Sequence, residues 1–304
     1  MLQGQKNFIF AVLTFLLGVL FLQLMGVVVK FIGSTYPALQ LTFFRNLFGI
    51  FPIIIFIYIS KNLKNKSLLV KIPMLWVAIL RGFFMTFAQF CFFTSLLYLQ
   101  FATANSLTLV TPFMVALFSM PILKIYVGAW KWIAIITGFS GAYMIISPPS
   151  NEVFSIYSLL PLGASFGYGM NLVLVRTFPQ NVPTVIIQWY SQLSSIFFTL
   201  ILVILTFEYV NIQSFNDLIM IILIGFFGGA GVFLMMSSYR MTDHINLGPF
   251  HYFTIIFSFF LGWIFFNESP FDELFPGIFF IVSAGIIIFW REKIKSYNKE
   301  WNKN

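Results

Sequence analysis

Long runs of hydrophobic residues dominate this chain, and short polar segments separate them. A helix that crosses the hydrocarbon core of a bilayer needs about 20 apolar residues, so runs of this length predict membrane-spanning helices. We predict ten spans, at Phe8–Phe31, Ala38–Ser60, Ile72–Tyr98, Ala102–Leu123, Trp130–Ser147, Phe154–Arg176, Thr184–Phe207, Leu218–Arg240, Leu247–Phe266 and Phe271–Trp290. The predicted fold class is therefore an all-α integral membrane protein with ten transmembrane helices.

The pattern also repeats within the chain. The stretch from Leu80 to Pro112 has a counterpart 143 positions later, and the same offset pairs Gly26 with Gly169. This predicts two five-helix repeats, one over residues 1–150 and one over residues 151–304, the second ending in a basic tail. An odd number of helices per repeat makes the two repeats inverted, which is a recurring plan of secondary transporters.

Composition supports a membrane location. Hydrophobic residues make up 60% of the chain and charged residues 9%, against roughly 25% charged in soluble domains. The net charge of +8 lies in loops and in the tail and forms no basic face, so we expect no nucleic-acid partner. The single cysteine, Cys91, excludes an internal disulfide and a multi-cysteine metal site. We expect no cofactor.

The distribution of Lys and Arg predicts the orientation. If the loops are assigned alternately to two sides, nearly all basic residues fall on the side of the N-terminus. The other side holds Lys30 together with acidic residues such as Glu208, Asp217 and Glu268. Positive charge is retained in the cytoplasm, so both termini are expected there.

Several segments resemble the drug/metabolite transporter superfamily, and within it the ten-helix EamA-type group. The first is Ala38–Phe48, which contains Phe43-Phe44-Arg45; the second is Ala102–Pro112; the third is Tyr252–Glu268, followed by Gly277 and Gly285. The region from Tyr239 to Tyr252 is also similar to S-adenosylmethionine importers. The resemblance implies a transporter of the bacterial cytoplasmic (inner) membrane. We expect a monomer or a homodimer, with a small-molecule substrate and the lipid bilayer as partners.

Arg45 and Arg81 are the most informative polar residues. A charge within a membrane span is costly and marks a functional site by default. Both side chains could bind an anionic group of a substrate, and both could instead snorkel outward or donate to carbonyls at helix breaks. Pro112 similarly predicts either a kink or a break in the fourth helix, because it frees the carbonyl of Thr108.

Other polar residues in the spans are weaker candidates for substrate binding. Each could line a wet cavity or bind a neighbouring helix, since a polar side chain in lipid needs a partner. They are Gln188 (the counterpart of Arg45), Trp189, Gln192, Asn105, Tyr168, Asn171, Tyr239 and His251. His251 could also carry a coupling proton. Gly225 and Gly229 have the spacing that allows close helix packing.

These features favour a secondary transporter that works by alternating access. The expected substrate is a small polar or amphipathic metabolite, such as an amino acid or an S-adenosylmethionine-like zwitterion. Its anionic group would pair with an arginine, and aromatic faces could hold a cation. The alternative is a polytopic membrane enzyme or a lipid-handling protein. An enzyme needs clustered catalytic groups, and this chain has two His, one Cys and no deeply embedded acid.

Overall fold

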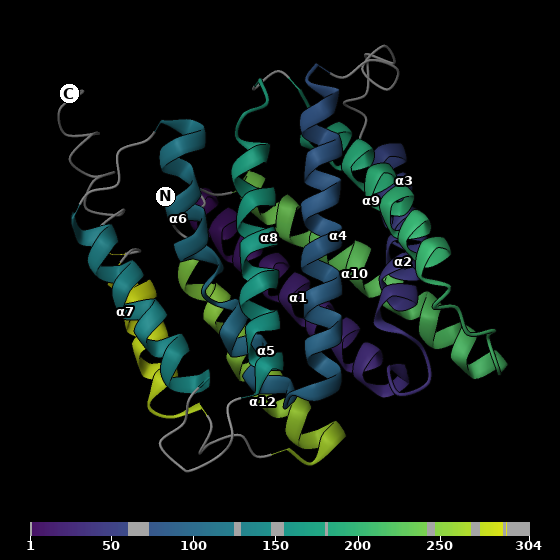
Figure 1. Cartoon of the computed structure of the whole chain (residues 1–304). Coiled ribbons are helices and arrows are strands. Elements are labelled where there is room, and N and C mark those ends of the chain that lie inside the picture. Colours follow the sequence, from purple (N-terminus) through teal and green to yellow (C-terminus); the bar gives the residue numbers. More distant parts are fainter. Residues whose placement is uncertain are drawn as a thin grey trace.

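The structure is a computed structural model that describes residues 2–59, 73–124, 129–146, 155–179, 182–241, 247–268, 274–287 and 290. Every regular element within these ranges is a helix. In chain order they are α1 (Leu2–Ile32), α2 (Ala38–Phe48), α3 (Ile50–Ile59), α4 (Leu75–Tyr98), α5 (Phe101–Thr108), α6 (Thr111–Leu123), α7 (Ala129–Ile146), η2 (Ile156–Ser158), α8 (Leu159–Val175), α9 (Thr184–Thr206), α10 (Phe215–Met241), η3 (Gly248–Tyr252), α12 (Phe253–Phe266) and a last helix, Gly277–Ile287 (Figure 1).

Seven helical segments are long and apolar enough to cross a membrane. They are Ile9–Ile32, Ala38–Ile55, Leu75–Tyr98, Phe101–Leu123, Ile156–Val175, Val185–Thr206 and Phe215–Met235. Three shorter apolar helices are Trp132–Ile145, Phe250–Phe266 and Gly277–Ile287. The prediction of an all-helical, multi-pass membrane protein is therefore confirmed.

Two predicted spans, found here as the segments Ala38–Ile55 and Phe101–Leu123, each consist of two helical elements. The second span divides into α2 and α3 at Gly49. The fourth divides into α5 and α6 between Thr108 and Thr111, ahead of Pro112, where the sequence predicts a kink or a break. The carbonyl of Thr108 accepts hydrogen bonds from Thr111 Oγ1 at 2.6 Å and from Ser165 Oγ at 3.2 Å. These side chains replace the helical donor that Pro112 lacks.

The helices pack in a layered bundle. In Figure 1, α4 and α8 stand side by side, and α1 and α10 cross diagonally behind them, each pair being in contact along its length. Glycines allow α10 to approach α2 closely: a Cβ on Gly225 would lie 2.2 Å from Cβ of Phe48, and one on Gly229 would lie 2.7 Å from the Gly49 carbonyl oxygen. The predicted role of these two glycines in close packing is confirmed.

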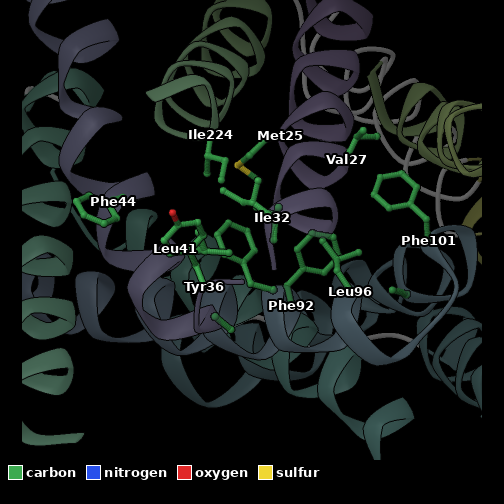
Figure 2. Packing of buried hydrophobic residues seen from close by; sticks show 14 of the residues in the cluster. Met25, Val27, Ile32, Tyr36, Leu41, Phe44, Phe92, Leu96, Phe101 and Ile224 are labelled. Carbon is green, nitrogen blue, oxygen red and sulfur yellow. The ribbon is translucent and has the colours of Figure 1, made fainter. Parts of the chain in front are cut away.

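A central apolar cluster joins six of the helices, α1, α2, α4, α5, α8 and α10. Figure 2 shows Met25 of α1, Leu41 of α2, Phe92 of α4, Phe101 of α5 and Ile224 of α10 converging in this cluster. All five side chains are buried. The faces that these helices turn toward one another are therefore interior faces, and polar residues on the same faces are shielded from lipid.

Candidate functional site

Arg45 lies in the middle of the bundle, on α2. Its side chain is 2% exposed, so its guanidinium does not reach the protein surface as snorkelling would require. Nη1 donates to Oδ1 of Asn46 at 3.1 Å, and Nη2 donates to the carbonyl of Gly228 on α10 at 3.4 Å. Nε has no hydrogen-bond partner among the described residues. Gly228 gives the Arg45 side chain room, because a Cβ there would lie 2.8 Å from Nε of Arg45 and 2.7 Å from Sδ of Met25, and these side chains would have to shift.

Asn46 connects Arg45 to α9. Nε2 of Gln192 donates to the Asn46 carbonyl at 2.7 Å and approaches its Oδ1 at 3.3 Å. Asn46 Oδ1 therefore accepts from both Arg45 and Gln192, while Nδ2 of Asn46 has no partner in the described part of the chain. The amide and the guanidinium form one continuous polar group between α2 and α9.

Arg81 lies on α4 and is held by α8 and α9. Its side chain is 4% exposed. Nε donates to the Asn171 carbonyl at 3.2 Å, Nη2 donates to Asn171 Oδ1 at 3.0 Å, and Nη1 donates to Ser191 Oγ at 2.8 Å. Asn171 Nδ2 in turn donates to the Arg81 carbonyl at 2.9 Å. Each nitrogen of this guanidinium thus has a protein acceptor, and the one backbone carbonyl among them belongs to Asn171 inside α8, not to a helix break.

These contacts place both arginines in one region, which we call the arginine centre and define as Arg45, Asn46, Arg81, Asn171, Ser191 and Gln192. Ser191 and Gln192 are neighbours on α9, so α9 joins the Arg45 and Arg81 groups. Tyr168, one turn before Asn171 on α8, is half-buried and lies near Arg45 and Cys91. The structure therefore brings together Arg45, Arg81, Gln192, Asn171 and Tyr168 from the predicted set.

No carboxylate pairs with either arginine among the residues that the structure describes. All acceptors in the arginine centre are neutral amides, hydroxyls or carbonyls. A buried charge is normally paired, because its transfer out of water is expensive. Two guanidinium groups in one buried region therefore favour an anionic ligand.

The remaining predicted site residues lie elsewhere or lack described contacts. Asn105 on α5 accepts from Nε2 of Gln23 at 3.0 Å, which joins α5 to α1. His251 in η3 packs edge-to-face on Phe15, with ring centroids 4.7 Å apart. Gln188 and Trp189 are half-buried at the start of α9. Tyr239 belongs to α10, but its side chain lies outside the described residues.

Sequence reasoning missed two members of the arginine centre, Asn46 and Ser191, and it also missed Gly228, whose carbonyl accepts from Arg45. Asn46 and Ser191 directly adjoin Arg45 and Gln192 in the chain, which is the signal that could have identified them. Gly228 contributes a backbone carbonyl, and its residue type carries no such signal.

A second charged group lies where α1 and α12 end and α5 begins. Lys30 Nζ pairs with Glu268 Oε1 and donates to the Leu99 carbonyl at 2.7 Å. Glu268 Oε2 accepts the backbone N–H of Phe101 at 2.6 Å, which caps α5 with a negative charge. Lys30 also lies over the Phe266 ring, 5.1 Å from its centroid. We call these five residues the Lys30–Glu268 cluster.

The described part of the chain contains no group of His, Cys, Asp and Glu that could hold a metal ion.

Comparisons with known proteins agree with this architecture. Residues 9–147 match the EamA-like transporter family. An S-adenosylmethionine uptake transporter of Rickettsia prowazekii is 21% identical over 95% of each chain, and one of Rickettsia conorii is 23% identical over 97% of each chain. A riboflavin transporter of Vibrio cholerae is 28% identical over 55% of each chain.

One solved crystal structure of a protein has a TM-score of 0.60 at 16% identity and covers 91% of this chain and 96% of the other. That likeness shows the fold alone. The fold and the family match define a multi-pass membrane protein of the transporter class, and the names of the relatives indicate transporters, not enzymes. Within that class, the match over residues 9–147 and the relatives support an EamA-type transporter of the drug/metabolite transporter superfamily, as the resemblance predicted.

Proposed function

We propose that this protein carries a small zwitterion of the S-adenosylmethionine type across the bacterial cytoplasmic membrane by alternating access. The observation that carries the proposal is the arginine centre, where Arg45 and Arg81 are buried without a carboxylate in the described residues. A carboxylate on the substrate would supply the missing negative charge. The uptake transporters similar to this chain over 87–97% of its length support the same substrate class.

Within the arginine centre, Arg45 is the residue that we assign to the anionic group. Its Nε is unpartnered in the described structure, whereas each nitrogen of Arg81 already donates to Asn171 or Ser191. Arg81 would then add positive potential and hold α4, α8 and α9 in place. Tyr168 supplies an aromatic face near Arg45, suited to a sulfonium or ammonium group. Riboflavin is neutral and has no carboxylate, so this centre fits it less well.

The proposal includes ten membrane spans in two inverted repeats, residues 1–150 and 151–304. Helix packing supports this arrangement. In the proposed repeats, α1, α2 and α4 correspond to α8, α9 and α10. The contact between α1 and α10 then corresponds to the contact between α8 and α4, and that between α2 and α10 corresponds to that between α9 and α4. All four contacts occur in the structure. The arginine centre draws residues from both repeats, which is where secondary transporters bind substrate. One chain supplies the whole centre, so a monomer would suffice and a homodimer is compatible with it.

Alternating access requires that one end of the protein closes while the other opens. The Lys30–Glu268 cluster joins α1 and α5 of the first repeat to α12 of the second, which supports closure at that end. With both termini in the cytoplasm, this is the external end. With the external end closed, a substrate bound at the arginine centre would be released toward the cytoplasm.

Uptake into proteoliposomes tests the function directly. Purified protein should accumulate or exchange labelled S-adenosylmethionine, and excess unlabelled S-adenosylmethionine should compete while riboflavin should not. Equal competition by riboflavin would contradict the assignment of substrate class. No uptake or exchange of any sulfonium zwitterion would contradict the proposed function itself.

Cysteine labelling tests the orientation, with Cys91 replaced by serine. A membrane-impermeant thiol reagent added outside should label a cysteine placed at Asn151 or Asn211 and should not label one at Asn65 or Asn298. The opposite labelling pattern would reverse the proposed topology and the assignment of the external end.

A further inference from the structure

Helix α4 has four faces, and the contacts and exposure of its residues define three of them. Toward α8, Ala88 and Cys91 lie against the glycines at 167 and 163. Toward α9, the Gly82 carbonyl accepts from Ser195 Oγ at 3.0 Å, and Thr86 Oγ1 donates to the Ser195 carbonyl at 3.4 Å. The exposed side of α4 carries Ile79, Phe83, Phe87 and Phe90. The remaining face points inward.

Arg81, Gln89, Phe92 and Leu96 make up that inward face. With 3.6 residues per turn, Gln89 lies about 80° around the helix from Arg81 and about 12 Å further along it. Phe92 and Leu96 on the same face contact the central cluster with Met25 and Leu41 (Figure 2). Gln89 lies seven residues from Leu96 and seven from Gly82, about 20° from each around the helix, so it faces the interior at the border with α9.

Gln89 differs from the other interior amides of the bundle. Its side chain is 1% exposed, and neither Nε2 nor Oε1 has a hydrogen-bond partner among the described residues. Asn105, Asn171 and Gln192 each bond with a protein group through at least one amide atom. A buried amide left unbonded is costly, and more so in a membrane, where lipid offers no partner. Gln89 is thus positioned to bind a ligand with both atoms.

We propose that Gln89 is a specificity-determining residue that binds a planar nitrogen heterocycle of the transported molecule. This inference rests on the proposed function and deepens it. A primary amide presents a donor and an acceptor side by side, which complements an adjacent acceptor and donor on a ring. The same pairing lets Asn and Gln recognise the N6 and N7 edge of adenine. Gln89 would therefore bind the adenine end of the substrate while the arginine centre binds the carboxylate end.

The spacing agrees with this division. Gln89 lies about 12 Å along α4 from Arg81, which belongs to the arginine centre, so the centre and Gln89 can contact different ends of an extended molecule. A sulfonium amino acid that lacks the nucleoside would reach the arginine centre and not Gln89. The two ends of the substrate can therefore be tested separately.

The test is binding of S-adenosylmethionine and of S-methylmethionine, a sulfonium amino acid without adenine, to purified full-length protein. Gln89→Leu should weaken S-adenosylmethionine binding about ten-fold or more, because two hydrogen bonds are lost. It should leave the affinity for S-methylmethionine within about two-fold of wild type. Gln89→Asn should also lose affinity for S-adenosylmethionine, since the shorter side chain withdraws the amide.

Stability distinguishes this role from a structural one. Replacing an unbonded buried amide by leucine should leave the melting temperature of the ligand-free protein unchanged or raise it. The matched control is Thr94→Val, which removes a hydroxyl on α4 that bonds only the Phe90 carbonyl and should change neither ligand's affinity.

Three results would overturn the inference. Unchanged affinity for S-adenosylmethionine in Gln89→Leu would do so, as would an equal loss for both ligands, and so would a marked fall in ligand-free stability. If wild-type protein binds neither ligand, the proposed function fails instead, and the failure is visible before any variant is made.

Discussion

The arginine centre and the Lys30–Glu268 cluster both hold positive charge in apolar surroundings, but only the cluster contains a carboxylate. In the cluster, Glu268 neutralises Lys30 and also caps α5 through the Phe101 N–H. In the arginine centre, two guanidinium groups share neutral acceptors. The cluster is complete within the protein, whereas under the proposed function the anionic group of the substrate completes the arginine centre.

The two regions also differ in exposure. The side chains of Lys30 and Glu268 are 14% and 17% exposed, so water screens part of their interaction. Arg45 and Arg81 are almost fully buried. Substitutions in the arginine centre should therefore change stability or ligand binding more than substitutions in the Lys30–Glu268 cluster do. Among the charged residues of the two regions, Arg45 should be the one whose substitution weakens ligand binding most.

The largest expected effect is on ligand binding in Arg45→Gln. Losing a charge-assisted hydrogen bond costs roughly 1.5–3 kcal/mol, which should weaken S-adenosylmethionine binding about ten-fold to over a hundred-fold. Arg45→Lys should not restore full affinity, because the planar fork of donors is lost. Binding and melting temperature of purified variants check this. Wild-type affinity in Arg45→Gln would remove Arg45 from the site.

Asn171→Leu should mainly reduce stability. The substitution removes an acceptor from Arg81 Nη2 and the donor to the Arg81 carbonyl, and it leaves a buried charge less well bonded. The free energy of unfolding should fall by roughly 1.5–3 kcal/mol, measured by thermal unfolding without ligand. Asn211→Leu, at an exposed position after α9, is the matched control. Equal melting temperatures for the two variants would show that Arg81 does not depend on Asn171.

Glu268→Gln should have a smaller effect on stability. The amide can still accept from Phe101, but Lys30 loses its negative partner. Because both side chains are partly exposed, the expected loss is about 1 kcal/mol, and it should shrink as the ionic strength of the buffer rises. Glu208→Gln, at an exposed position, serves as control. A loss that does not change with salt would argue against an ionic contribution.

The fold class could be predicted from the sequence, and the two arginines could be singled out as candidates, because both signals can be read from the sequence alone. Apolar runs report membrane spans directly, and Arg45 and Arg81 are conspicuous within such runs. The contacts that decide their roles are not visible in the same way. That Arg81 is held by Asn171 and Ser191 depends on how α4, α8 and α9 pack.

The missed features have the same cause. Lys30 and Glu268 are 238 residues apart in the chain, and each looked like an ordinary charge near a helix end. The division between α2 and α3 at Gly49 lies inside an apolar run whose pattern predicts a single helix. The division before Pro112 could be predicted, because proline lacks the N–H that a continuous helix needs. The hydroxyls that bond the Thr108 carbonyl instead belong to Thr111, three residues away, and to Ser165 on another helix, and the second of these contacts depends on packing.

The smallest expected effect comes from removing the ion pair altogether, in Lys30→Met with Glu268→Gln. Replacing both charged partners is often nearly neutral, because no unpaired charge remains, whereas removing one partner leaves a partly buried ion alone. The double variant should therefore unfold within about 1 kcal/mol of wild type and should be more stable than Glu268→Gln alone. The four unfolding free energies of the cycle give the interaction energy of the pair. If the two single losses simply add, Lys30 and Glu268 do not stabilise each other, and the cluster would then resemble the arginine centre in having a cation that the protein itself leaves unbalanced.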